Sequence, residues 1–301
     1  MLVLTVVALT AGCGLARGDG GSTAGGEPAS QISSPPPPQT FPASGEFWHA
    51  GFHVTLTGAT IAARPLAFGD GWQRSLTIDA MITNLGPQQQ RFGSDVAVEA
   101  NGTSYPSGAG TDLSPVPSGL TSEGHFSFDI DDSFDYDVAS LVVGGGQVTQ
   151  ARLPLGTQGG EPVTGEPQEL AITGIASLEL VDIHVTSAEL RSDVPESYTA
   201  IPAGQLALTL HLNATSRRRG NWILFPEFFA LVTPNGTAVG VAGGDLGSIQ
   251  GADGGIDNEG LSIRFLIPDP AAGQYTLRFN PSGALRHDDD DPDGATLTFT
   301  I

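Results

Sequence analysis

The last acidic segment of the chain, HDDDDPDG, has the residue types and spacing of a calcium-binding loop. Asp289, Asp291 and Asp293 alternate along it, and Gly294 follows where such a loop needs a sharp turn. Ca²⁺ prefers clustered oxygen ligands of this kind. The last ligand position of the motif, however, falls on Thr300 instead of a bidentate Glu. Two interpretations stay open: a Ca²⁺ site, or a solvated acidic turn between two strands.

The only basic run is Arg217-Arg218-Arg219, in a chain whose 12 basic residues are all Arg. Such a run can form a small anion-binding site or contact phosphates of the cell envelope. The alternative is an exposed turn whose charges pair with the protein's own acidic loops, because charge runs are usually solvated.

A second acidic cluster precedes Val138. Its members are Asp129, Asp131, Asp132, Asp135 and Asp137. The cluster lacks a turn glycine and is interrupted by aromatic residues, so a solvated loop is favoured over a metal site.

The histidines do not converge in the sequence. His53, His125, His184 and His211 occupy outward positions of alternating segments, where a polar residue belongs whatever the function. His49 and His53 are expected on one strand and one face, about 13 Å apart, which is too far for a shared zinc ion.

Catalytic signatures are absent from the sequence. It contains no G-x-S-x-G, H-E-x-x-H, P-loop, G-x-G-x-x-G after a strand, or C-x-x-C. We therefore expect a protein that is not an enzyme. A secreted hydrolase with an active site assembled from distant residues remains the alternative.

The only cysteine, Cys13, ends an apolar run at Thr10-Ala11-Gly12-Cys13. This junction resembles the lipobox of bacterial lipoproteins, which implies that residues 1–12 are a signal peptide and that Cys13 is acylated. No basic residue precedes the apolar run, so we expect the true start to lie upstream. An uncleaved apolar N-terminus is the alternative.

Residues 13–45 are rich in Gly, Ser and Pro and include the run Pro35–Pro38. Flexible Gly/Ser stretches and a stiff proline run predict a tether that holds a folded part away from a surface. The apolar run before Cys13 is far shorter than the roughly 20 residues of a spanning helix. The sequence thus predicts a protein anchored by lipid at the outer face of the cytoplasmic membrane or the cell surface.

Composition excludes some partners. The formal net charge is -21, from 33 acidic and 12 basic residues. Nucleic acids and anionic lipid surfaces attract positive charge, so neither is expected as the main partner. A single cysteine allows no intramolecular disulfide, and the fold must therefore be stabilised by burial.

The remaining chain is built from short alternating segments. Apolar Leu76, Ile78, Ala80 and Ile82 alternate with polar or exposed neighbours, and the segment 206–212 repeats the pattern. Period-two alternation predicts half-buried antiparallel strands, so we expect an all-β protein. The spacing of roughly seven strands in each half is typical of two tandem immunoglobulin-like sandwiches. We place them at residues 46–156 and 169–301, with a linker at 157–168.

The two halves also repeat each other in sequence. In each half an Asn-Gly dipeptide, which supplies positive φ for a tight hairpin turn, lies between apolar runs. The collinear matches are Phe52–Thr55 with Ile183–Thr186, Ile82–Asn84 with Leu212–Ala214, Val98–Thr103 with Val232–Thr237, and Gly124–Phe128 with Leu261–Phe265. A tandem duplication is predicted.

Each half, on these same segments, resembles the telokin-like, immunoprotective extracellular domains of Gram-positive lipoproteins, a family without an established reaction. The resemblance implies an immunoglobulin-like fold and an extracellular location. Together with Cys13, it favours a lipid-anchored, non-catalytic protein that binds an envelope protein or another ligand. A calcium-stabilised adhesion or scaffold module using Asp289, Asp291 and Asp293 is the second candidate.

Overall fold

A computed structural model describes residues 34–65, 71–217, 219–280 and 294–301. Their strands belong to one compact unit, Pro35–Ile301. Apart from strands, this part of the chain contains three short 3₁₀ helices: η1 (Tyr136–Val138), η2 (Pro195–Ser197) and η3 (Pro226–Phe228). The predicted all-β fold is confirmed. No helix within the described ranges is both long and apolar enough to cross a membrane.

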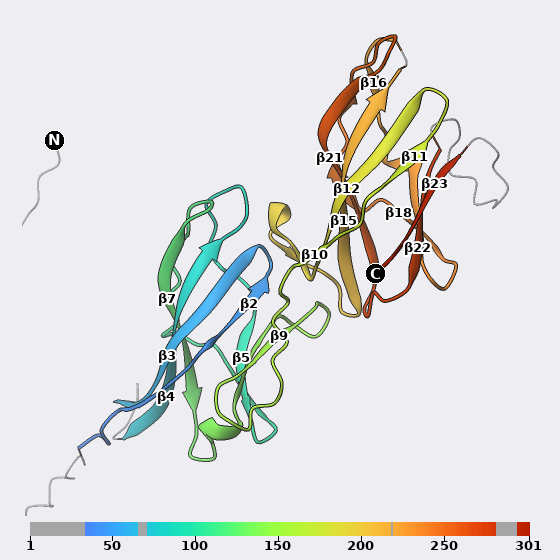
Figure 1. The fold of residues 1–301 in the computed structure, drawn as a ribbon. Coiled ribbons are helices and arrows are strands. Elements are labelled where there is room, and N and C mark those ends of the chain that lie inside the picture. Colours follow the sequence, from blue (N-terminus) through green and yellow to red (C-terminus); the bar gives the residue numbers. More distant parts are fainter. Residues whose placement is uncertain (1–33, 66–70, 218, 281–293) are drawn as a thin grey trace, which may run out of the picture. The chain divides into compact units, whose positions relative to one another are not determined.

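The first half folds into two facing antiparallel sheets (Figure 1). One sheet has the order β1-β3-β4-β7, with β2 also paired to β3, and the other has the order β6-β5-β8-β9. The strands are β1 (Gln39–Phe41), β2 (Gly45–His49), β3 (Phe52–Pro65), β4 (Trp72–Asn84), β5 (Val96–Ala100), β6 (Thr103–Pro106), β7 (Thr121–Ile130), β8 (Ser140–Val143) and β9 (Ala151–Pro154).

The second half repeats this strand order. One sheet runs β10-β12-β15-β21-β19, with β11 paired to β12, and the other runs β18-β17-β22-β23. Its strands are β10 (Gln168–Leu170), β11 (Gly174–Ser177), β12 (Val181–Arg191), β15 (Gln205–Ser216), β17 (Phe229–Val232), β18 (Ala238–Gly240), β19 (Gly243–Asp245), β21 (Ile256–Pro268), β22 (Gln274–Phe279) and β23 (Ala295–Thr300). Short pairs β13 (Asp193–Val194) with β14 (Thr199–Ala200), and β16 (Trp222–Ile223) with β20 (Ser248–Ile249), complete it.

Each half has its own hydrophobic core, formed by the inward residues of both of its sheets. In β4 the predicted residues Leu76, Ile78, Ala80 and Ile82 are buried, as the alternation requires. Phe92 contributes an aromatic cluster to the first core, with its ring edge-on to the rings of three other buried phenylalanines. These are Phe47, Phe52 and Phe126, with ring centroids 6.2, 5.5 and 5.9 Å from that of Phe92.

A β-bulge marks the same place in both halves. The ladder between β3 and β4 skips Thr57, and the ladder between β12 and β15 skips Thr186. The bulges therefore make Phe52 equivalent to Val181, two residues from its sequence match, Ile183. An alternating pattern looks the same after a shift of two residues, so the sequence could not detect this difference.

The two Asn-Gly dipeptides form different turns. Asn101 and Gly102 have φ values of 51° and 77° and join paired residues Ala100 and Thr103, as predicted for a tight hairpin. In the second half, five residues separate the paired Val232 and Ala238, and of the dipeptide only Gly236 has positive φ. There the Gly236 N–H donates to the Thr233 carbonyl at 2.8 Å, so the dipeptide lies in a four-residue turn, and the Asn235 side chain reinforces this turn by accepting from Thr233 and Thr237.

A further tight turn, between β2 and β3, contains no Asn-Gly dipeptide. Ala50 and Gly51 have φ values of 49° and 81°, so His49 pairs with Phe52 and Trp48 pairs with His53. The expectation that His49 and His53 share one strand and one face is therefore wrong. His49 ends β2 and is buried, whereas His53 lies on β3 with its ring stacked on Trp48 at 4.3 Å.

Candidate functional site

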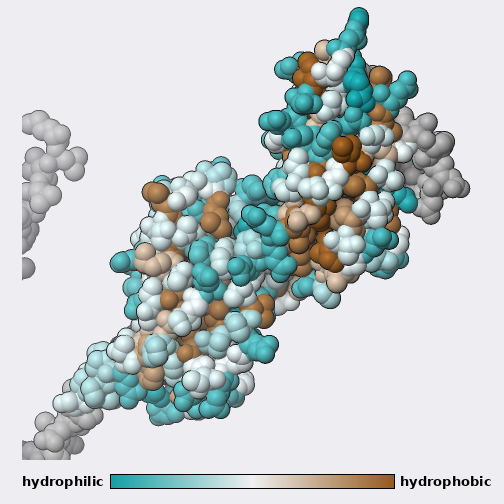
Figure 2. All heavy atoms as spheres, viewed as in Figure 1, coloured by the Kyte–Doolittle hydropathy of each residue, from teal (hydrophilic) through white to brown (hydrophobic). Residues whose placement is uncertain are grey.

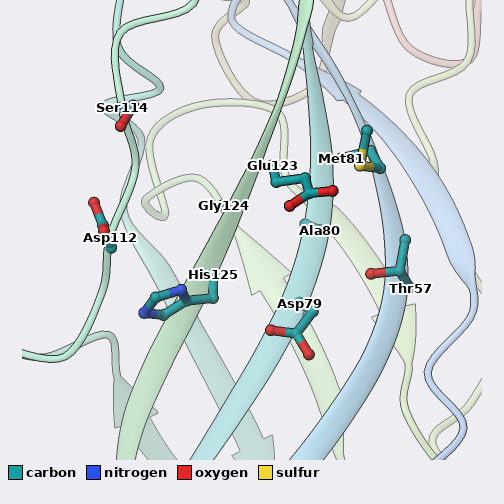
Figure 3. Close-up of a pocket in the computed structure, with 9 residues that line it drawn as sticks. All are labelled: Thr57, Asp79, Ala80, Met81, Asp112, Ser114, Glu123, Gly124 and His125. Carbon is teal, nitrogen blue, oxygen red and sulfur yellow. The ribbon is translucent and has the colours of Figure 1, made fainter.

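The first sandwich carries a cavity of about 470 Å³ on the outer face of its β3-β4-β7 sheet (Figure 3). Nine residues line it: Thr57, Asp79, Ala80, Met81, Asp112, Ser114, Glu123, Gly124 and His125. We call this cavity the acidic cleft. The sheet forms its floor, and the segment 107–116 contributes the wall with Asp112 and Ser114 (Figure 3).

The strand ladder sets which side chains meet on the floor of the acidic cleft. Asp79 of β4 pairs directly with His125 of β7, and Met81 pairs with Glu123. Side chains of directly opposed residues project from the same face of a sheet, so an imidazole lies beside one carboxylate and a thioether beside another. The bulge in β3 adds the exposed hydroxyl of Thr57 to this face.

Backbone hydrogen bonds hold the wall against β7. The Asp112 N–H donates to the His125 carbonyl, and the His125 N–H donates to the Asp112 carbonyl, both at 3.0 Å. The absence of a side chain at Gly124 allows this approach. A Cβ there would lie 3.1 Å from Leu113 Cδ2 and 3.2 Å from the Asp112 carbonyl oxygen.

The charge of the acidic cleft is negative and unpaired. Asp79, Asp112 and Glu123 are exposed, and no Arg is among the nine lining residues. Within the part of the chain that the structure describes, none of the three carboxylates forms an ion pair. Clustered like charges in a recess concentrate counter-ions, so the acidic cleft attracts cations. No group of three or more metal-ligating side chains in the described ranges has the geometry to hold a metal ion.

The corresponding surface of the second sandwich has different chemistry. There His211 pairs with Ser262, in the register positions of Asp79 and His125. Asp245 of β19 pairs with Ser262 as Asp112 pairs with His125. Asp79 is thus replaced by His211, and at the position of the Met81–Glu123 pair the ladder is interrupted at Asn213, Glu259 and Gly260, so the paired arrangement of carboxylates on this surface is specific to the first half.

The acidic cleft could not be found from the sequence. Asp79, Asp112 and Glu123 are separated by 33 and 11 positions and belong to no motif. His125 was predicted to face outward, and it is half-buried on the outer face. The one local signal for the acidic cleft is that Asp79 lies on a predicted strand, at a position that alternates with buried residues. This signal does not say which strands are neighbours in the sheet.

The predicted anion site is occupied by the protein's own carboxylates. Arg217 donates to Asp182 at 2.7 Å, and this bond holds the pKa of Asp182 below its ordinary value. Arg219 forms a bidentate pair with Asp253 and lowers the pKa of that carboxyl in the same way. Arg218 lies outside the described residues. The geometry of Arg217 and Arg219 favours the interpretation as an exposed, internally paired turn.

The second acidic cluster is dispersed among local contacts. Asp131 accepts hydrogen bonds from Ser133 Oγ at 2.6 Å and Tyr105 Oη at 3.0 Å, which lower its pKa. Asp129 pairs with Arg64, and Asp135 caps η1. Asp131 and Asp135 therefore organise the turn before η1, in agreement with the solvated-loop interpretation, whereas Asp129 lies on β7. The other predicted site residues, Cys13 and the calcium candidates Asp289, Asp291 and Asp293, lie outside the described residues.

The surface also exposes apolar side chains. On the face drawn in Figure 2, the larger hydrophobic patch lies over the second sandwich. Ile175 and Leu180 of this half are 52% and 47% exposed. Nothing in the structure shows what covers them, so they define no site.

Comparisons with known proteins give distant structural similarity only. No family model and no curated protein matches the chain. A functionally unknown protein from Listeria monocytogenes EGD-e matches with a TM-score of 0.31 and 10% identity, covering 46% of this chain and 87% of its own. A conserved domain protein from Bacillus anthracis matches with a TM-score of 0.24 and 10% identity, covering 87% of this chain and 90% of its own. Similarity at this level carries no argument about function.

Proposed function

We propose that this chain is a non-catalytic binding protein of the cell envelope, anchored through a lipid on Cys13, that engages a cationic partner at the acidic cleft. The observation that supports a cationic partner is the gathering of Asp79, Asp112 and Glu123 around one cavity whose described lining includes no Arg. Attraction between a negative cleft and a positive partner increases mainly the specificity and the rate of association.

The strand order supports the immunoglobulin-like part of the proposal. In the first half a five-stranded sheet faces a four-stranded sheet, and the chain crosses between the two sheets after β4, after β6 and after β7. The second half, with a six-stranded and a four-stranded sheet, makes the corresponding crossings after β15, β18 and β21. Such Greek-key crossings are typical of immunoglobulin-like sandwiches, which commonly present binding surfaces to partners. The fold by itself assigns no partner.

The chemistry of the acidic cleft supports binding over hydrolysis. Ser114 and His125 both line it, but no hydrogen bond joins them in the described part of the molecule. A serine nucleophile needs a base within hydrogen-bonding reach. The secreted-hydrolase alternative therefore gains no support from this cavity.

The binding proposal is tested by calorimetry on the full chain with a hexa-lysine peptide as probe. We expect the double variant Asp79→Asn/Glu123→Gln to weaken binding about tenfold, or ~1.4 kcal/mol. The control is Asp245→Asn/Glu259→Gln, which removes the same charge from exposed positions of the second sandwich. Equal weakening by both variants would show that only net charge matters and would refute a specific site.

The anchor is tested separately by cell fractionation. Acylation of Cys13 would attach two chains, which is sufficient for stable membrane attachment. The variant Cys13→Ala should therefore move to the soluble fraction. If it still sediments with membranes, the anchor proposal is wrong, whatever the result for the acidic cleft.

A further inference from the structure

A second cavity, of about 450 Å³, shares no residue with the acidic cleft. The end of β2, the segments 93–95 and 144–148, and residues 198–200 line it. The side chains of chemical interest there are His49, Ser94, Asp95, Gln147 and Thr199. Its volume lies in the range of small-molecule sites in proteins.

His49 is the unusual member of this cavity. It is 3% exposed, yet within the described part of the chain its imidazole has no hydrogen-bond partner. Among the described residues, the one side-chain nitrogen that is both fully enclosed and without a hydrogen-bond partner is Arg191 Nη2. The His49 nitrogens, which also lack a partner, are therefore reached by solvent. A ligand in the cavity would take the place of solvent at these nitrogens and complete the hydrogen bonds of the imidazole.

The backbone of Gly144 packs beside the His49 ring. A Cβ at Gly144 would lie 2.8 Å from His49 Cε1 and 3.3 Å from Nε2. Gly144 also has a φ of 96°, so any other residue there would be strained. The chain thus keeps a glycine where a side chain would press on the unpartnered imidazole.

The walls of the cavity are held by the backbone. The Thr149 N–H donates to the Ile201 carbonyl at 2.7 Å, and the Ala203 N–H donates to the Gln147 carbonyl at 3.1 Å. The Gly144 N–H donates to the Asp95 carbonyl at 2.9 Å. The cavity is therefore preformed, which lowers the entropy cost of binding.

The charge and hydrogen-bonding capacity of the lining limit the ligand. Burial lowers the pKa of His49, against the opposing effect of Asp193, so the imidazole is neutral at neutral pH. A neutral imidazole presents one donor and one acceptor, and Asp95 presents acceptors only. No Arg lines the cavity, which disfavours an anion. An ammonium group would leave the imidazole N–H unmatched, whereas hydroxyl groups both donate and accept.

We propose that this cavity binds a neutral saccharide, with hydroxyl groups of the sugar hydrogen-bonded to the His49 imidazole and the Asp95 carboxylate. The site is independent of the acidic cleft, because the two are lined by different residues and select different chemistry.

The test uses the full chain labelled with ¹⁵N-histidine, with the His49 imidazole followed by NMR. The probes are methyl glucoside, N-acetylglucosamine and cellobiose, and butylammonium chloride is the cation control. We expect at least one saccharide to shift the His49 signals saturably, and butylammonium to leave them unchanged. His53, which is bonded to Glu46 outside the cavity, is the internal control.

Two variants that keep His49 test whether the change in its NMR signals arises from binding in this cavity. Asp95→Asn changes an exposed carboxylate, and Gly146→Leu adds a side chain at a rim position where a Cβ would meet nothing within 4 Å. Each variant should lower the affinity for the saccharide at least about tenfold, or ~1.4 kcal/mol. Asp112→Asn, in the acidic cleft, should leave this affinity unchanged. The absence of a His49 shift with all three saccharides would overturn the proposal, as would a shift that neither variant weakens.

Discussion

At the scale of single residues, the buried charges are the most constrained feature. Asp193 is 1% exposed and accepts hydrogen bonds from the Gly51 N–H at 2.7 Å and from Arg191 Nε at 2.9 Å. Arg191 also pairs with Glu189 at 3.0 Å. A buried ion pair adds little by itself, but removing one partner leaves an uncompensated charge.

We therefore predict that Asp193→Ala lowers the free energy of unfolding by about 3–5 kcal/mol. Urea denaturation measures this change, and Asp245→Ala, at an exposed position, serves as the control, with an expected effect within about 0.5 kcal/mol. A small loss for Asp193→Ala would mean that Arg191 can reach solvent when its partner is removed.

His49 predicts a pH dependence of stability. Its folded pKa is lowered by burial from the ordinary 6.5, so the unfolded chain binds the proton more readily. The stabilisation is complete above about pH 6.5 and is lost as the pH falls through the folded pKa. Between pH 7 and pH 5, wild type should lose more stability in urea denaturation than His49→Leu does. Equal losses would contradict a neutral, buried His49.

At the scale of elements, the segment 107–116 decides whether the acidic cleft exists. Bridges pair Ser107 with Phe128 and Asp112 with His125, so this loop covers the free edge of β7. An edge strand whose backbone is paired in this way is protected from pairing with other chains.

Gly124→Val should displace this wall, because even a Cβ would be tightly placed against Leu113 and the Asp112 carbonyl. We expect a loss of about 1–3 kcal/mol in stability, faster hydrogen exchange at the Asp112 and His125 amides, and weaker binding of hexa-lysine. The control is Gly108→Ala in the same loop, where the nearest atom to an added Cβ is 3.9 Å away. Unchanged exchange rates in Gly124→Val would show that β7 does not hold the loop.

At the scale of the whole molecule, a net charge of -21 makes cations the natural partners. The predicted Ca²⁺ ligands Asp289, Asp291 and Asp293 precede β23, the last strand of its sheet. Binding there would stabilise the folded chain by mass action.

Calorimetric melting of the full chain should therefore rise in millimolar Ca²⁺, and Asp291→Ala should remove the rise. Asp257→Ala, an exposed acidic substitution on β21, controls for general screening of charge. No rise in wild type would leave the acidic segment as a solvated turn.

Much of this architecture follows from local pattern. Alternation in residues 76–82 predicted a buried face that the structure confirms, because burial on one side of a sheet requires a period of two. In the segment 206–212, Leu208, Leu210 and Leu212 are buried as predicted, but Ala207 and Thr209, which alternate with them, are buried as well. The Asn101-Gly102 turn followed from the positive φ that both residues tolerate. The Ala50-Gly51 turn carried a weaker signal, and missing it misplaced His49.

The sequence by itself determined the all-β class and most of the inward residues of the strands, because each depends on neighbours along the chain. The partners of Arg217 and Arg219, which are Asp182 and Asp253, lie 35 and 34 positions away and were decided by the tertiary structure. Only the tertiary structure decided the bulge register, the burial of His49 and the meeting of Asp79, Asp112 and Glu123. A shift of two residues preserves an alternating pattern, and nothing local specifies which strand lies beside which. Distant pairing is selected by how the two sheets bury their faces together, so both candidate sites emerge only when the sheets are assembled.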